Sequence, residues 1–164
     1  MKLIKMLRMT AVALFISGLV SSNSMATTGQ SSATVILPIT VEKITDLDFG
    51  SVVGGSIGQV LISSGNPTSR NTSTTVQTLG SNFSRGFFVV RGQPNTPWTY
   101  SVVPLQLSLS NGTSTMTVNL SPSQGSSTIS NTGVQVLLIA GELLLDGTET
   151  AGAYSATYNV SVDY

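Results

Sequence analysis

Apolar and polar residues alternate with a period of two along almost the whole chain after residue 26, and no segment there has a helical period. The clearest run is the last one, in which one face carries Tyr154, Ala156, Tyr158, Val160, Val162 and Tyr164. Turn residues, such as the Asn111-Gly112 pair that is typical of a hairpin, separate roughly nine or ten short segments. The pattern predicts an all-β domain, an immunoglobulin-like antiparallel two-sheet sandwich.

The N-terminus is typical of a secretory signal peptide. Lys2, Lys5 and Arg8 precede an apolar run over residues 10–20, and residues 21–26 end in Ser-Met-Ala. The run is too short to span a bilayer, which takes about 20 residues. We expect cleavage after Ala26, one β-sandwich domain over residues 27–164, and secretion to the periplasm or cell surface of a Gram-negative bacterium. The alternative is an N-terminal helix that remains attached as an anchor.

The composition argues against catalysis and nucleic-acid binding. The chain has neither histidine nor cysteine, so the usual general base, thiol nucleophile and zinc ligands are missing. Residues 27–164 carry four basic and seven acidic side chains, with no basic stripe. We therefore expect no enzyme, no cofactor and no nucleic-acid partner. Without disulfides, an exported domain depends on its core or on neighbouring subunits.

Two acidic pairs are the nearest approach to a metal site. Asp46 and Asp48 have strand spacing, and Asp146 and Glu149 share a turn. Calcium needs six to eight oxygen ligands, so each pair is too small and is more simply a solvated face.

Trp98 and Tyr100 are more simply a core pair than a platform that stacks on a sugar ring.

Two segments are apolar on both faces, residues 87–90 and residues 137–145. A central strand that is covered on both sides explains this pattern most simply. The alternative is an exposed apolar strip that docks another chain, and its residues would be Phe88, Val90, Leu137 and Ile139. Ala140-Gly141 within the second segment predicts a bulge or bend.

The ordered stretches ATVILPITVEKITDLDFGSV, FFVVRGQPNTPWTYSV, VLLIAGELLL and AGAYSATYNVSVDY resemble a bacterial domain-of-unknown-function family, number four-four-zero-two. The resemblance covers the chain after residue 26 and implies secretion and a sandwich fold, with no established activity. The LDFG motif and the terminal Tyr-rich strand are also similar to the spore-coat-U and archaic chaperone–usher pilin group. Those pilins commonly carry cysteines near the first strand, and this chain has none. The pilin likeness implies assembly by strand exchange.

We therefore expect a structural or adhesive surface subunit that self-associates into an oligomer or fibre. A polar lead precedes an alternating run over residues 33–41, so residues 30–43 are the predicted strand donor, with Val35, Leu37, Ile39 and Val41 as its apolar side chains. The same run is alternatively the first strand of its own domain. The terminal strand over residues 153–164, with Tyr154, Tyr158, Val160, Val162 and Tyr164, is the predicted partner in either case, or alternatively the element that closes the opposite edge. In the pilin-like interpretation, Tyr164 suits capture by a periplasmic chaperone. A monomeric extracellular module that binds a surface glycan is the alternative function.

Overall fold

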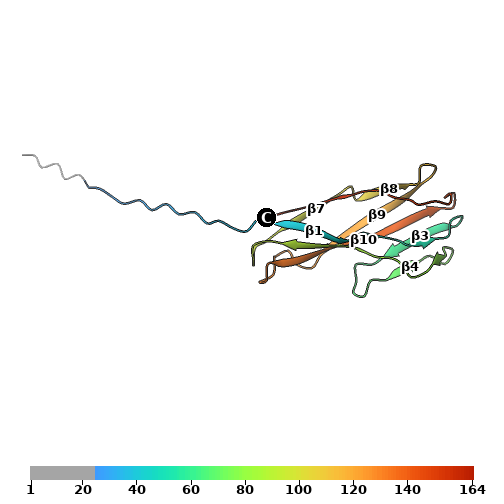
Figure 1. Cartoon of the computed structure of the whole chain (residues 1–164), viewed down its shortest axis with the longest axis horizontal. Helices are drawn as coiled ribbons and strands as arrows, with labels where there is room; N and C mark the ends of the chain where they lie inside the picture. Colours follow the sequence, from blue (N-terminus) through green and yellow to red (C-terminus); the bar gives the residue numbers. More distant parts are fainter. Residues whose placement is uncertain (1–24) are drawn as a thin grey trace, which may run out of the picture. The chain divides into compact units, whose positions relative to one another are not determined.

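The structure, a computed structural model, describes residues 25–164, and these form strands and loops without a helix. Residues 25–34 contain no strand and their side chains are exposed. A compact unit spans Val35–Tyr164 and holds eleven strands (Figure 1). The prediction of an all-β chain is thus confirmed. Residues 1–24 of the predicted signal peptide lie outside the described residues.

The strands pair antiparallel in one seven-stranded sheet and two two-stranded ribbons. They are β1 (Thr40–Thr45), β2 (Ser51–Val52), β3 (Ile57–Ile62), β4 (Arg70–Thr72), β5 (Thr78–Leu79), β6 (Gly86–Arg91), β7 (Thr99–Val103), β8 (Gln106–Ser110), β9 (Thr115–Gln124), β10 (Val134–Asp146) and β11 (Asn159–Asp163). The large sheet has the order β1-β6-β10-β3-β4, with β9 and then β8 added beside β10. The ribbons are β11-β7 and β2-β5. The predicted hairpin at Asn111-Gly112 joins β8 to β9, and Gly112 has the positive φ of 88° that such turns require.

Strand β10 is the centre of the sheet and runs without interruption for 13 residues. Along one edge it pairs first with β6, up to Ile139, and then with β3, from Gly141. Its pairing with β9 continues through Ala140 and Gly141, so the predicted bulge at these residues is wrong. Gly141 serves another purpose, because a Cβ there would lie 2.7 Å from Leu47 Cδ2 and 3.1 Å from Phe49 Cζ. The glycine allows this segment to approach β10 closely.

The hydrophobic core joins the large sheet to the β11-β7 ribbon. Its largest fully buried side chains are Trp98, Ile62, Ile129, Leu137, Ile139, Val60, Val90 and Val118. Trp98 donates from Nε1 to the carbonyl of Ser126 at 2.8 Å, and its ring lies 6.2 Å from that of Tyr100, which is the expected core pair.

The four residues of the possible docking strip all lie in this core. Phe88 is 6% exposed, and Val90, Leu137 and Ile139 are fully buried. The ribbon residues Val102, Val160 and Val162 belong to the same cluster, so the domain itself covers this face. The alternative of an exposed apolar strip is therefore wrong for these residues. The strands are central, as expected, but only this face is fully buried, because Phe87, Val89 and Leu138 on the opposite face are half-buried.

The alternating run predicted over residues 33–41 becomes a strand only at Thr40. From there β1 pairs with β6 within the same chain, with Val41 opposite Val90. Residues 33–39 belong to no strand, since Pro38 has no N–H to donate to a ladder. The predicted donor segment is thus divided: its second part is an edge strand of its own domain, and its first part is unpaired.

Candidate functional site

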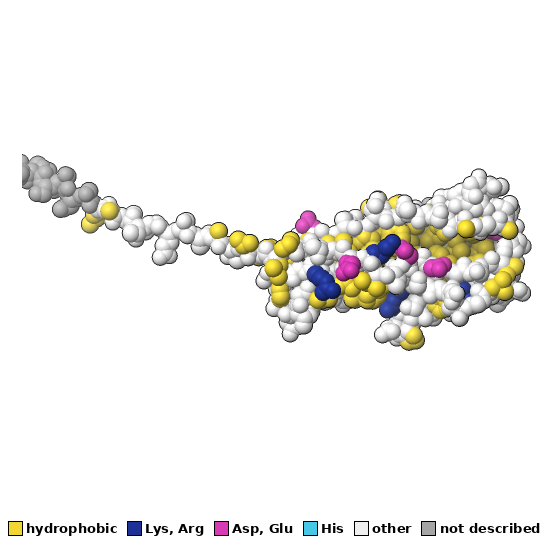
Figure 2. Space-filling view, viewed as in Figure 1, with side chains coloured by type: hydrophobic (Ala, Val, Ile, Leu, Met, Phe, Trp, Pro, Cys, Tyr) yellow, Lys and Arg dark blue, Asp and Glu magenta, His cyan; other side chains and the backbone are white. Residues whose placement is uncertain are grey.

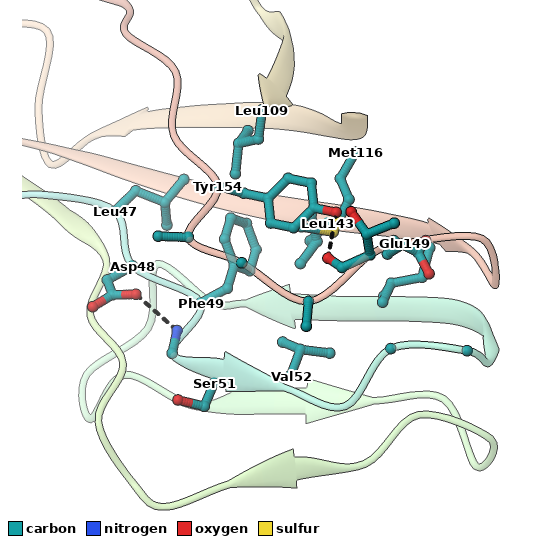
Figure 3. Close-up of a pocket in the computed structure, with 18 residues that line it drawn as sticks. Leu47, Asp48, Phe49, Ser51, Val52, Leu109, Met116, Leu143, Glu149 and Tyr154 are labelled. Atoms are coloured by element: carbon teal, nitrogen blue, oxygen red, sulfur yellow. Dashed lines mark hydrogen bonds between the residues drawn. The ribbon is translucent and has the colours of Figure 1, made fainter. Parts of the chain in front are cut away.

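A cleft of about 850 Å³, with an apolar floor and partly polar walls, opens between two segments that are nearly 100 residues apart in the sequence (Figure 3). One wall is formed by residues 47–55 and the other by residues 149–154. Between the walls lie apolar side chains from three strands of the large sheet, namely Leu109, Met116, Leu143 and Leu145. We call this hollow the cleft. It opens directly above core residues, an arrangement that suits an apolar occupant.

The acidic residues beside the cleft bind their own backbone. Asp48 Oδ1 accepts a hydrogen bond from the Gly50 N–H at 2.8 Å (Figure 3). Glu149 Oε1 accepts one from the Asp146 N–H at 2.7 Å. Asp146 Oδ1 accepts bonds from the hydroxyl and the N–H of Thr148, and these bonds lower the pKa of Asp146. Within residues 25–164 no group of three or more His, Cys, Asp or Glu side chains is placed to hold a metal ion.

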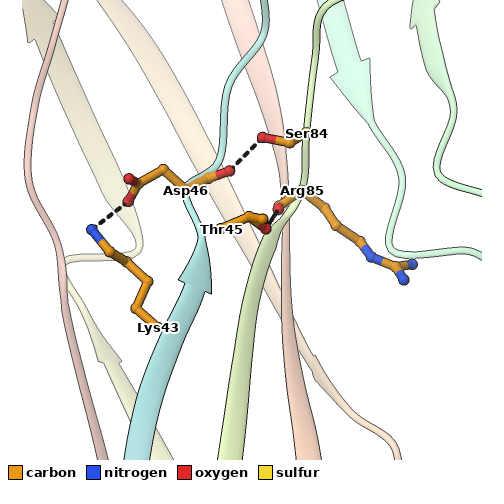
Figure 4. Close-up of polar contacts among 5 residues, drawn as sticks. All are labelled: Lys43, Thr45, Asp46, Ser84 and Arg85. Atoms are coloured by element: carbon orange, nitrogen blue, oxygen red, sulfur yellow. Dashed lines mark hydrogen bonds and ion pairs between the residues drawn. The ribbon is translucent and has the colours of Figure 1, made fainter.

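Asp46, the other acid considered as a ligand, fixes the end of β1 (Figure 4). Its carboxylate forms an exposed ion pair with Lys43 at 2.8 Å, and its carbonyl accepts a hydrogen bond from the Ser84 hydroxyl at 2.6 Å. The Thr45 hydroxyl donates to the carbonyl of Arg85 at 2.9 Å. These contacts attach the chain before the cleft to the start of β6.

A second pocket, of about 320 Å³, lies between β1 and residues 156–160. Each side of this pocket continues along the chain into one wall of the cleft, since residues 41–46 precede residues 47–55 and residues 156–160 follow residues 149–154. Within the described residues no strand pairs with the outer edge of β1, and β11 pairs with β7 alone. Figure 2 shows apolar side chains in a band along this face, with charged side chains beside it. The domain thus has an apolar seam between its first and last strands, which widens into the cleft.

Tyr158 lies under this seam and packs edge-on against Phe88, with ring centroids 6.3 Å apart. Its hydroxyl is buried and has no hydrogen-bond partner among the described residues. Burial, and secondly the charge of Asp46, raise the pKa of Tyr158 to about 12. The nearby backbone of Leu47 lowers the pKa slightly, which is the smallest of the three effects. Its geometry does not make it a hydrogen-bond partner of the hydroxyl.

Replacing Tyr158 with phenylalanine is expected to change how stability depends on alkaline pH. The folded-state pKa of about 12 lies above the ordinary 10.0, so above pH 10 the unfolded chain loses the phenol proton first. The free energy of unfolding of the wild type should therefore fall between pH 10 and pH 12 more steeply than that of Tyr158→Phe. At neutral pH the variant should be at least as stable, because it removes an unpartnered buried hydroxyl. Urea unfolding of both proteins at several pH values measures this, and parallel curves would contradict the burial of the hydroxyl.

The structure places the predicted donor residues in two environments. Val35 is 94% exposed and Leu37 is 58% exposed, whereas Ile39 and Val41 are half-buried and pack against the core. The predicted terminal strand is wrong in its start and in its predicted partner: it is a strand only over Asn159–Asp163 and pairs with β7, whereas β1 pairs with β6. Of its predicted residues, Tyr154, Tyr158, Val160 and Val162 are half-buried, and Tyr164 is exposed. Tyr154 lines the cleft, and Tyr158 and Val160 line the second pocket.

Sequence reasoning missed the cleft. Its floor residues Leu109, Met116 and Leu143 each fit a strand face and carry no local sign of a binding site. The one available signal was the LDFGSVVGG stretch, whose paired glycines follow a strand and line the wall.

Residues 25–164 include no helix of the length and hydrophobicity that a membrane span requires. No curated protein and no solved structure matches the chain. Residues 39–164 match the family described as Domain of unknown function (DUF4402). That segment contains all eleven strands and both walls of the cleft. The chain belongs to the DUF4402 family.

Proposed function

We propose that this chain is a secreted structural or adhesive subunit of a bacterial cell surface, assembled by donation of an N-terminal segment from one copy to the next. Removal of a signal peptide at Ala26 would leave residues 27–36 as an arm before the domain. The fold would be an immunoglobulin-like two-sheet sandwich with room for one more strand. Export would bring the subunit to the periplasm of a Gram-negative bacterium, where a chaperone is a second expected partner.

The cleft is the observation that carries this proposal. Its floor consists of half-buried Leu109 and Met116 and the core residues Leu143 and Leu145, between segments that do not pair with each other. A hollow with an apolar floor and a few polar groups in its walls is typical of a binding site. An extended peptide fits such a site because its main chain can add to a strand edge and its alternate side chains can fill apolar hollows.

The chain itself contains a segment with the matching chemistry. Residues 27–37 carry no charge, and Ala33, Val35 and Leu37 alternate with other residues, so in an extended peptide they share one face. Burying Val35 or Leu37 is worth about 1.5–3 kcal/mol for each side chain. Residues 40–45 already pair with β6, so the donor is the part of the predicted segment that precedes them.

A monomeric binding module is the second candidate, because a volume of about 850 Å³ is also that of a small-molecule site. Glycan sites usually present an aromatic side chain to the sugar ring. Two aromatic residues line the cleft, but Phe49 is buried, and Tyr154 is half-buried with its hydroxyl donating to the Thr150 carbonyl at 2.8 Å. In the described part of the chain Tyr164 is the one exposed aromatic residue, and it lies outside the cleft. The subunit proposal is therefore preferred, and the two differ in the oligomeric state that they require.

The test compares the chain of residues 27–164 with a form that lacks residues 27–36. We expect the longer chain to form assemblies that survive dilution in gel filtration and appear as fibres or rings in negative stain. The deletion should lower the assembled fraction at least tenfold without loss of strand signal in circular dichroism. Val35→Ser should act like the deletion, and Gln30→Ser, a change between polar arm residues, should not. A full-length chain that remains monomeric at high concentration would favour the binding module instead.

A further inference from the structure

Leu37, at the base of the arm, is bound through its backbone to two side chains of its own domain. The Leu37 N–H donates to Gln93 Oε1 at 3.2 Å, and the Leu37 carbonyl accepts a hydrogen bond from the Tyr164 hydroxyl at 2.7 Å. The same hydroxyl accepts a hydrogen bond from the Gln93 N–H at 2.5 Å. We call Leu37, Gln93 and Tyr164 the clasp. It joins three parts of the chain at one point, and residues 37 and 164 are 127 positions apart.

The neighbours of the clasp restrict the same stretch of backbone. Pro38 fixes its own φ and favours an extended conformation at Leu37. Gly92 leaves room for the tyrosine, since a Cβ there would lie 2.6 Å from the Tyr164 hydroxyl and 3.4 Å from Ile39 Cγ1. The clasp binds the N–H and the carbonyl of Leu37, although this residue belongs to no strand, and it leaves the Leu37 side chain 58% exposed.

We propose that Tyr164 is a positioning residue of assembly: with Gln93 it fixes Leu37 so that the arm is presented to another copy and does not fold back into its own cleft. This inference rests on the proposed function. The arm precedes the start of β1 at Thr40, and the wall of the cleft follows the end of β1 at Thr45, so an arm that entered its own cleft would have to turn back along β1 near residues 37–39. That turn requires Leu37 to leave the extended conformation that the clasp and Pro38 hold. If Leu37 were flexible, the arm could bind the cleft of its own chain. This intramolecular binding would compete with donation to another copy, because the tethered arm has a high effective concentration at its own cleft.

The test uses the whole chain of residues 27–164 with the substitution Tyr164→Phe, which keeps the ring and removes the hydroxyl from both bonds. The chain has no cysteine, so Ser32→Cys and Ser51→Cys introduce one spin label in the arm and one beside the cleft. Dilution of the doubly labelled chain into unlabelled protein restricts the measured distances to those within one chain. We expect Tyr164→Phe to add a population with a short label distance and to raise the closed monomer fraction roughly tenfold, the effect of losing one or two hydrogen bonds.

Matched variants separate positioning from general stability. Gln93→Ala should behave like Tyr164→Phe, and Gln93→Glu should retain wild-type behaviour because an acceptor oxygen remains for the Leu37 N–H. Tyr100→Phe removes a different hydroxyl, which comes from β7 of the ribbon and contacts the Pro122 carbonyl of β9, and should leave the label distances unchanged.

The outcomes distinguish this inference from the proposed function. If the wild type assembles but Tyr164→Phe shows no new short distance, the clasp does not position the arm, and the subunit proposal stands. If the wild type never assembles, the subunit proposal fails, and the label distances still decide whether the clasp keeps the arm out of the cleft. A lower melting temperature of Tyr164→Phe without a short-distance population would show a merely structural role and overturn the inference.

Discussion

Replacing Leu137 with alanine is expected to lower the free energy of unfolding by about 2–5 kcal/mol. Leu137 is fully buried in the first half of β10, where it lies between Phe88 of β6 and Gln124 of β9. The loss combines the apolar surface of the removed atoms with the cavity that remains, because strands on both sides limit how far the site can collapse. A domain of this size is often no more than 5–15 kcal/mol stable, so the variant should show a much lower urea midpoint.

The same strand offers a matched control in Leu144→Ala. Leu144 is 37% exposed, so the same chemical change there should cost only about 1 kcal/mol. Urea unfolding followed by tryptophan fluorescence measures both, since Trp98 is the single tryptophan of the chain. Equal losses for the two variants would contradict the burial of Leu137. A Leu137→Ala protein of normal stability that fails to assemble would restore the docking-strip interpretation.

Strands and turns were predictable where the pattern of side chains within one short segment was sufficient to identify them. The apolar segment over residues 87–90 lies within β6, and Asn111-Gly112 became the hairpin between β8 and β9. Both signals are local, since one depends on side chains within a strand and the other on backbone freedom at a turn.

The predictions failed where a distant segment determines the outcome. Gly141 indicated a bulge because glycine weakens a strand, yet its role is to admit Leu47 and Phe49, which lie more than 90 positions earlier. Phe88 and Leu137 could have been either core or an exposed strip, because the residues that cover them come from the β11-β7 ribbon. A sequence pattern gives the face on which a side chain lies, but not what packs against that face.

The cleft and the clasp were unpredictable for the same reason. Each depends on residues before position 56 that meet residues after position 148, and no local pattern records that meeting. What the sequence did contain was the chemistry of both partners: an uncharged alternating segment at one end and a tyrosine-rich strand at the other. Strand donation could therefore be proposed from the sequence, whereas the cleft that we propose as its acceptor could not.

A peptide of residues 28–37 is expected to raise the melting temperature of the domain that lacks residues 27–36 by about 10 °C. At a peptide concentration 100 times its dissociation constant, binding to the folded state alone adds about 2.7 kcal/mol. For a domain of about 130 residues, each kcal/mol moves the midpoint by roughly 3–5 °C. The driving force is burial of Val35 and Leu37 over Leu109, Met116 and Leu143 in a cleft that the domain leaves open. Differential scanning fluorimetry over a series of peptide concentrations measures the shift and its saturation.

Two matched changes make this result specific to the cleft. A peptide with serine in place of Val35 and Leu37 keeps the length and lack of charge, and it should shift the midpoint by less than about 2 °C because little apolar surface is buried. On the domain, Met116→Gln keeps the length of a half-buried side chain but makes the floor polar, so it should weaken the effect of the natural peptide without unfolding the domain. Equal shifts from the natural and the serine peptides would show that neither side chain enters the cleft. A full shift with Met116→Gln would place the peptide elsewhere, and the free edge of β1 would then be the next acceptor to examine, because an extended peptide can also add there through its main chain alone.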